Sequence, residues 1–233
     1  PHESSAASDV YKRQTLGIAL LLSLQPDIGQ TLLVFFSWSV LIFTSGISIF
    51  LLFFLFSSII FIFFYLIFFV PKFTYIKNRI ISFLDAETGT YNFQSDKALE
   101  SITSGGFFGK GIGEGTLKNR VPEAHTDYII SVISEEFGVI AIILIFLLFL
   151  VFIYSVFKKV NFENDETIKL ILVGSISLIL MQTIIHIGVN IRLFPTTGMT
   201  LPFISYGGSS IISISILSGI ILNLTKRNLN QNE

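Results

Sequence analysis

Two long stretches with almost no charge constrain this chain more than any other feature of its sequence. Between Thr15 and Val70 the only charged residue is Asp27, and between Leu193 and Thr225 there is none. About 18 consecutive apolar residues are enough to mark a helix that crosses a membrane. Charged residues make up 13% of the chain, about half the share of a soluble domain. We therefore predict an all-α polytopic membrane protein.

The rest of the composition excludes several kinds of chemistry. The net charge is -1, so no basic surface indicates binding to nucleic acid. The absence of cysteine excludes disulfides, thiolate nucleophiles and cysteine-ligated metals, and leaves the redox compartment open. Apart from His2 there are two histidines, His125 and His186, so no multi-histidine metal site can form. The Gly-x-Ser-x-Gly pattern of a serine hydrolase is also absent.

The beginning of the chain divides into two parts of different composition. Pro1–Gln14 is polar and unlike everything that follows, and we interpret it as a foreign leader sequence. We assign residues 15–233 to one membrane domain. Thr15–Leu24 is apolar, but at 1.5 Å per residue it is too short to cross a hydrocarbon core of about 30 Å. It is predicted to be the end of a span.

The remaining apolar runs predict five full spans, which are Thr31–Ser45, Ile47–Val70, Tyr128–Phe157, Thr167–Asn190 and Ser210–Leu224. Asp27 is placed to cap the first of them, and Pro71 to end the second. The connection over residues 71–126 is far longer than the roughly 12–15 residues of an ordinary loop. Within it, Ser95–Thr103 is predicted to form a short amphipathic helix.

A cluster of glycines, Gly105–Gly115, contains a Gly-Lys pair at 109–110 and superficially resembles a phosphate-binding loop. The pattern fails because Ser104 stands where the first glycine of such a loop is required, and Gly111 follows Lys110. Two interpretations remain open. The cluster is either a flexible loop near the membrane surface or a cradle of backbone amides for a phosphate-bearing lipid.

Short basic segments predict the orientation in the membrane. The pairs at 158–159 and 226–227 lie two spans apart, so both are expected on the cytoplasmic side. Residues 121–128 and the Pro- and Gly-rich segment 191–208 then both lie on the outer side. The two outer segments can therefore meet over one site.

Residues 121–128 gather the polar side chains best suited to chemistry: Glu123, His125, Thr126 and Asp127. Asp127 and Thr126 directly precede an apolar helix, so either could serve as its N-cap. Alternatively, the Asp127 carboxylate could act as a general base towards a sugar hydroxyl.

A second polar group lies inside a predicted span. Gln182, His186 and Asn190 follow one another at intervals of four residues, which places them on one face of the helix. Polar side chains within a membrane face the bundle interior or a wet cavity. These three either form hydrogen bonds between helices or line a substrate cavity.

Four stretches, in this order, carry a resemblance to a known family: Gln25–Gly29, Pro122–Tyr128, Glu135–Gly138 and Pro195–Ser210. With them, residues 15–233 resemble the C-terminal half of the SEDS family, which contains FtsW, RodA and SpoVE. The wording of the second and fourth stretches is more similar to the FtsW branch.

The resemblance implies a ten-helix peptidoglycan glycosyltransferase that polymerises lipid II at the outer face of the bacterial cytoplasmic membrane. This chain would supply one partial and five full spans, with residues 71–126 as the large extracytoplasmic loop. The family's essential aspartate falls on Asp127, which would act as the base in an inverting transfer from a lipid-pyrophosphate donor. A divalent cation, Mg²⁺ or Mn²⁺, is left open. Supporting or substrate-binding roles are expected for Glu123, His125, Thr126, Gln182, His186, Asn190, Ser205, Tyr206, Gly207, Gly208 and Ser209.

The resemblance also implies partners and a place of action. The partners would be lipid II, the growing glycan strand, membrane lipids, a class B penicillin-binding transpeptidase and other cell-division proteins, with the protein located at the division septum. The family's first four helices and part of the fifth have no counterpart here, so we expect this chain alone to be inactive. Two other functions stay open: a lipid II flippase, with Gln182, His186 and Asn190 along its path, and a non-enzymatic scaffold of the division complex.

Overall fold

A computed structural model describes residues 17–18, 21–22, 27–84, 93–116 and 121–227 of the chain. The proposed leader 1–14 and most of the partial span 15–24 lie outside the described residues. The described part is helical, without strands. Its elements are α2 (Ile28–Thr44), α3 (Ile49–Phe69), the short 3-10 helix η1 (Pro71–Phe73), α4 (Thr74–Leu84), α5 (Phe93–Gly105), α6 (Ile129–Val160), α7 (Glu166–Asn190) and α8 (Gly208–Arg227).

Each of the five predicted spans corresponds to one of these helices. In the described part of the chain, four helices are long and apolar enough to cross a membrane, namely α3, α6, α7 and α8. The fifth, α2, is apolar but has 17 residues. The chain is therefore a multi-pass membrane protein, and the predicted all-α class is confirmed.

Local sequence signals set the helix boundaries as predicted. Asp27 caps α2 by accepting a hydrogen bond from the Gln30 backbone N–H at 3.0 Å. Gly46 has a φ of 86° between α2 and α3, where its lack of a Cβ permits the turn. Pro71 follows the end of α3 and starts η1, because a proline at the first helical position loses no hydrogen bond.

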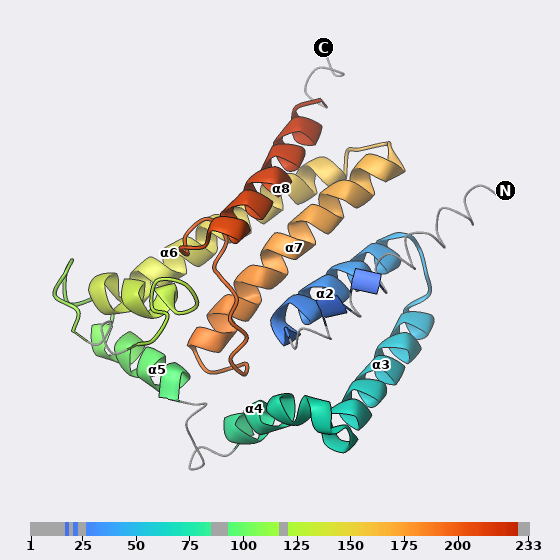
Figure 1. Cartoon of the computed structure of the whole chain (residues 1–233). Coiled ribbons are helices and arrows are strands. Elements are labelled where there is room, and N and C mark those ends of the chain that lie inside the picture. Colours follow the sequence, from blue (N-terminus) through green and yellow to red (C-terminus); the bar gives the residue numbers. More distant parts are fainter. Residues whose placement is uncertain (1–16, 19–20, 23–26, 85–92, 117–120, 228–233) are drawn as a thin grey trace.

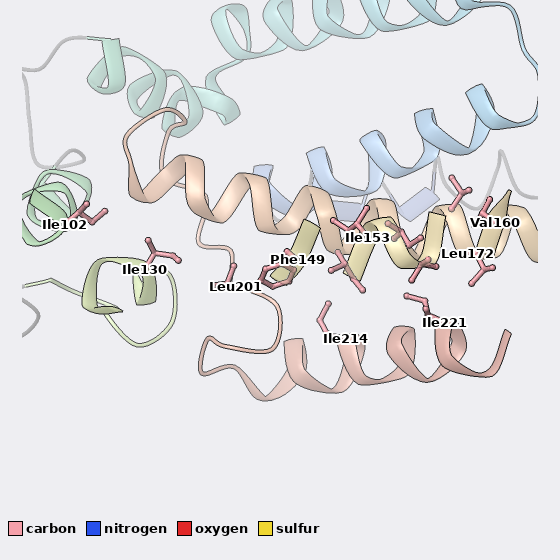
Figure 2. Packing of buried hydrophobic residues seen from close by; sticks show 13 residues of the cluster. Ile102, Ile130, Phe149, Ile153, Val160, Leu172, Leu201, Ile214 and Ile221 are labelled. Atoms are coloured by element: carbon pink, nitrogen blue, oxygen red, sulfur yellow. The ribbon is translucent and has the colours of Figure 1, made fainter. Parts of the chain in front are cut away.

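Helix α7 is the centre of the bundle, and it packs against α2, α5, α6 and α8 (Figure 1). Figure 2 shows the largest apolar cluster, in which Leu172 of α7 lies among residues of α6 and α8 such as Ile153 and Ile221. Helix α3 differs from these helices because its apolar window has no buried residue. Its large apolar side chains are mostly exposed, whereas Phe56 packs against Phe35 of α2 with 5.2 Å between the ring centres.

Helix α6 is interrupted at Gly138, which has non-helical angles of φ 80° and ψ 176°. The glycine segment 105–116 fills this break. The backbone N–H groups of Lys110 and Gly111 donate to the carbonyls of Glu135 and Glu136 at 2.9 and 3.0 Å. The segment is thus a packed part of the fold and not a flexible loop, and these two amides are not free to cradle a phosphate.

The glycines of this segment are required by close approach between backbones. A Cβ on Gly109 would lie 2.2 Å from the Glu136 carbonyl oxygen, and one on Gly138 would lie 2.1 Å from the Phe107 carbonyl oxygen. Real atoms do not approach so closely. Glycine is therefore a packing requirement on both sides of the break.

Candidate functional site

The two segments predicted on the outer side meet at one end of the bundle. Ser205 Oγ donates to the Thr126 carbonyl oxygen at 2.7 Å, and the Tyr206 backbone N–H donates to the His125 carbonyl oxygen at 3.0 Å. Ser205 Oγ also accepts from the Leu201 N–H at 2.8 Å, which closes the segment on itself. The predicted meeting of residues 121–128 with residues 191–208 is confirmed.

Gln182, His186 and Asn190 form a polar stripe along α7 that holds this junction together. Gln182 Nε2 donates to the Thr200 carbonyl oxygen at 2.9 Å, and His186 Nδ1 lies 2.7 Å from the Met199 carbonyl oxygen. Both partners belong to the segment 191–208 and not to another helix. The prediction of hydrogen bonds between helices is therefore wrong for these two residues, because the segment folds back along α7 and takes up their polar atoms.

Asn190 completes the stripe and reaches the segment that carries Asp127. Its Nδ2 donates to the Asp127 carbonyl oxygen at 3.0 Å and to the His186 carbonyl oxygen at 2.9 Å. Asn190 is fully buried. Three consecutive carbonyls, those of His125, Thr126 and Asp127, are thus held by groups from α7 and the segment after it.

A single carbonyl oxygen organises the turn that presents Asp127. The Glu123 carbonyl accepts from the N–H groups of Thr126, Asp127 and Tyr128 at 3.1, 3.1 and 3.3 Å. Glu123 itself has a φ of 55°, in the left-handed region that few residues other than glycine adopt. This turn separates residues 123–128 from α6.

Neither Asp127 nor Thr126 caps α6. The N-cap position is occupied by Tyr128, which makes no side-chain capping bond. Thr126 Oγ1 turns back to Glu123, with its carbonyl oxygen at 3.1 Å and Oε2 at 3.0 Å. The N-cap interpretation is therefore wrong for both residues. No hydrogen bond is made by the Asp127 carboxylate within the described part of the chain.

The surroundings of the Asp127 carboxylate make it more basic. Burial, followed by the nearby negative charge of Glu123, raises the pKa of Asp127 above its ordinary value. A group that must remove a proton gains driving force as its pKa rises. The pair Glu123 and Asp127 is thus suited to one base supported by a neighbouring carboxylate.

Gly198 borders the same carboxylate, although it was not among the predicted site residues. A Cβ at this position would lie 3.5 Å from Asp127 Oδ2, and the φ of Gly198 is 71°. A larger side chain would strain the backbone and crowd the acid. Gly198 lies inside the stretch Pro195–Ser210 that carried the family resemblance. Its position in that stretch was the sequence signal that could have identified it as a site residue.

Two residues from the N-terminal half of the chain, Gly29 and Arg79, contact the segment 191–208. Gly29, at the start of α2, packs against the segment so closely that a Cβ would lie 2.9 Å from Met199 Cγ. Arg79 of α4 donates from Nη1 to the Thr196 carbonyl oxygen at 2.9 Å. Burial and the charge of Asp127 raise the pKa of Tyr128, whereas Arg79 acts in the opposite direction. Arg79 therefore brings positive charge near Tyr128.

The other predicted site residues lie around this centre without a described bond to the Asp127 carboxylate. His125 and Tyr206 have exposed side chains, and Gly208 and Ser209 form the first turn of α8. Gly207 lies against Thr200, whose Cγ2 would be 3.2 Å from a Cβ at that position. These residues shape the rim of the site.

The described residues include no group of three or more histidines, aspartates or glutamates that could hold a metal ion. Glu123 and Asp127 supply two carboxylates at the site, and this part of the chain offers no third. Two carboxylates alone do not make a metal site formed only by protein.

Comparisons with known proteins were made for the whole chain. A family profile for FtsW, RodA and SpoVE, described as "Cell cycle protein", matches residues 8–230. A "Probable peptidoglycan glycosyltransferase FtsW" from Caulobacter vibrioides (strain NA1000 / CB15N) is 36% identical over 219 residues, covering 91% of this chain and 53% of that protein. One of the same name from Wigglesworthia glossinidia brevipalpis is 37% identical over 209 residues, covering 87% and 54%.

A solved structure is also similar. The structure titled "Structural coordination of polymerization and crosslinking by a peptidoglycan synthase complex" matches with a TM-score of 0.64 and 26% identity, over 91% of this chain and 58% of that one. The chain spans about half the length of the curated relatives that it matches.

Proposed function

Because the chain belongs to the FtsW/RodA/SpoVE family of cell cycle proteins, we propose that it is part of a peptidoglycan glycosyltransferase, one that polymerises lipid II at the outer face of the bacterial cytoplasmic membrane. The proposal concerns the protein of family length, since the chain covers 53% of its relative from Caulobacter vibrioides. We expect residues 15–233 alone not to catalyse the reaction. The observation that carries the proposal is the placement of Asp127.

Asp127 is the proposed general base. Its carboxylate takes the proton from the 4-hydroxyl of the acceptor lipid II sugar, and that oxygen attacks the anomeric carbon of the growing strand. The new glycosidic bond forms as the bond from the anomeric carbon to the lipid pyrophosphate breaks, with inversion at that carbon. The carboxylate is partly buried, accepts no described hydrogen bond and has a raised pKa, which suits it to this role.

One carboxylate is enough because the leaving group is a stable anion. A glycoside hydrolase needs a second carboxyl group to protonate a poor leaving group. The lipid pyrophosphate leaves without a proton, so Glu123 is not required as an acid. Its proposed contribution is electrostatic: its negative charge raises the pKa of Asp127.

The charge on the pyrophosphate has to be balanced as the bond breaks. Arg79 is the proposed source of positive charge, and this is supported by its bond to the Thr196 carbonyl oxygen, two residues before Gly198, which borders the Asp127 carboxylate. Arg192 and Lys110 are engaged elsewhere, in ion pairs with Asp96 at 2.6 Å and Glu135 at 3.1 Å. Arg79 would act alongside basic groups in the part of the family fold that this chain does not match.

The α7 stripe favours a polymerase over a flippase. A transport path requires polar groups that face the moving head group. Here Gln182, His186 and Asn190 bond to the backbone of residues 127, 199 and 200. Their proposed role is to hold the outer site in place.

The proposed partner is a class B penicillin-binding transpeptidase, and the proposed location is the division septum. The similar solved structure is titled as a peptidoglycan synthase complex that coordinates polymerization and crosslinking. A glycan strand produced at the outer face would be the substrate for crosslinking there.

The test is polymerisation of labelled lipid II by the purified full-length protein with its transpeptidase. Asp127→Asn preserves the shape of the side chain and removes the base, so the rate should fall by about 10²–10⁴-fold. The matched control is Ser213→Ala, whose exposed hydroxyl bonds to the Ser209 carbonyl of its own helix. Normal glycan synthesis by Asp127→Asn would remove Asp127 from the mechanism. Movement of lipid II across vesicles by a parent protein that makes no glycan would favour the flippase.

A further inference from the structure

Three large apolar side chains on the glycine segment point away from the rest of the protein. Phe107, Phe108 and Ile112 are 74%, 83% and 78% exposed. Apolar groups gathered on a surface mark a place where something else binds. Nothing in the catalytic proposal above makes use of these three residues.

The backbone of the segment fixes its depth relative to the membrane. The N–H groups of Val139 and Ile140 donate to the carbonyls of Gly106 and Phe107 at 3.0 and 3.4 Å. These two α6 residues lie at the start of the apolar part of the helix, where Phe137 and Ile140 are 46% and 45% exposed. The exposed patch is therefore continuous with the exposed apolar surface of α6.

Backbone hydrogen bonds within the protein also allow the glycine segment to enter the apolar part of a membrane. Irregular backbone is tolerated at membrane depth only where its polar groups are bonded within the protein. The N–H groups of Gly109, Lys110 and Gly111 all donate to carbonyls at 2.9–3.0 Å. The Lys110 ammonium pairs with the buried Glu135 carboxylate at 3.1 Å, so its charge is compensated.

We propose that Phe107, Phe108 and Ile112 form an apolar wedge that inserts among the acyl chains of the outer leaflet beside α6. Lipid is the occupant that the continuity with Phe137 and Ile140 favours, since both belong to a helix that is long and apolar enough to cross a membrane. The wedge would hold the outer end of α6, and with it the start of the segment that carries the site, at a fixed depth. The inference does not depend on the catalytic role of Asp127.

This chain contains no cysteine, and any cysteine in the remainder of the full-length protein would be replaced by serine before labelling. Phe108→Cys and Ile112→Cys would each be labelled with a nitroxide in the full-length protein, reconstituted in phosphatidylglycerol–phosphatidylcholine vesicles. Collision rates with oxygen and with a water-soluble nickel chelate would then be compared. Glu114→Cys, an exposed position in the same segment, is the aqueous reference, and Leu144→Cys, 56% exposed on α6, is the lipid reference.

Both wedge positions should show an oxygen-to-nickel collision ratio several-fold higher than position 114 and close to that of position 144. A ratio equal to that of position 114 in both variants would overturn the proposal. So would labels that collide freely with nickel in vesicles and become shielded from both reagents only when the transpeptidase is added, which would assign the patch to a protein partner. Equal melting temperatures of the Phe108→Cys and Glu114→Cys proteins control for folding.

Discussion

The side-chain amide of Asn190 donates a hydrogen bond to the backbone carbonyl of Asp127, with 3.0 Å between the two atoms. The donor stands at the end of α7 and the acceptor stands just before α6. The backbone of the proposed base is thus held by another helix, while its carboxylate makes no described bond. Asn190 therefore holds the backbone of Asp127, while burial and Glu123 raise the pKa of its carboxylate.

Asn190→Ala should slow catalysis without removing the base. The change leaves the Asp127 carbonyl without its buried donor and lets the carboxylate move, and a misplacement of about 1 Å can cost about 10²-fold in rate. The loss of the buried hydrogen bonds should also lower the free energy of unfolding by about 1–3 kcal/mol. Steady-state polymerisation should show a lower kcat with little change in KM for lipid II. Unchanged turnover at wild-type stability would contradict a positioning role.

Glu123→Gln should shift the pH dependence of polymerisation. As the proposed base, Asp127 would work only when ionised, so the rate should fall as the pH drops through its pKa. Burial and the charge of Glu123 both raise that pKa, and the substitution removes the second of these. The acid limb of the kcat/KM profile should therefore move to lower pH, while the remaining burial keeps it above the ordinary range. Glu114→Gln is the control, and an identical shift there would point to a general charge effect.

Glu135→Ala should destabilise the outer end of α6. The Glu135 carboxylate is fully buried, and it accepts from the Thr116 N–H at 2.9 Å and from Ser101 Oγ at 3.2 Å, besides pairing with Lys110. Removing it leaves the Thr116 N–H without its acceptor, at a cost of about 1–3 kcal/mol, whereas Ser101 Oγ keeps the Ser131 carbonyl oxygen at 3.2 Å. Lys110 is one-third exposed and can regain water, which limits the loss. Thermal unfolding in detergent, beside an exposed control such as Glu114→Ala, would measure the difference.

Gly138→Ala should be more harmful than a glycine-to-alanine change at Gly208 or Gly219 of α8. The φ of 80° costs about 1–3 kcal/mol for a residue with a Cβ, and that Cβ would meet the Phe107 carbonyl oxygen at 2.1 Å. Gly219→Ala in α8 is the control, because a Cβ there meets nothing within 4 Å. It should leave the melting temperature unchanged or slightly higher. Similar melting of the two variants would argue against a rigid break.

The spans and the position of the site could be predicted from the sequence because both rest on strong signals. Runs without charge predict α3, α6, α7 and α8, and the basic pairs at 158–159 and 226–227 predict which ends lie together. A local signal such as Asp27 before an apolar run also predicted its own hydrogen bond. In each case the determining residues are close together in the chain.

What the sequence did not reveal depends on contacts between distant segments. The residues around Gly138 read as one continuous apolar helix, because the break is stabilised by carbonyls about thirty positions earlier in the chain. Asp127 and Thr126 had the composition of an N-cap, but the Glu123 turn carries them away from α6. Gln182 and His186 were placed on the right face of α7, yet their partner was a returning loop.

The break in α6 also decides how the protein matches the thickness of its host membrane. At 1.5 Å per residue, an unbroken helix over Ile129–Val160 would measure roughly 48 Å, well beyond a hydrocarbon core of about 30 Å. The stretch after Gly138 measures roughly 33 Å and is nearly commensurate with that core. In a thinner or thicker bilayer, only residues 139–160 therefore need to tilt. The geometry around Asp127 is then protected from hydrophobic mismatch.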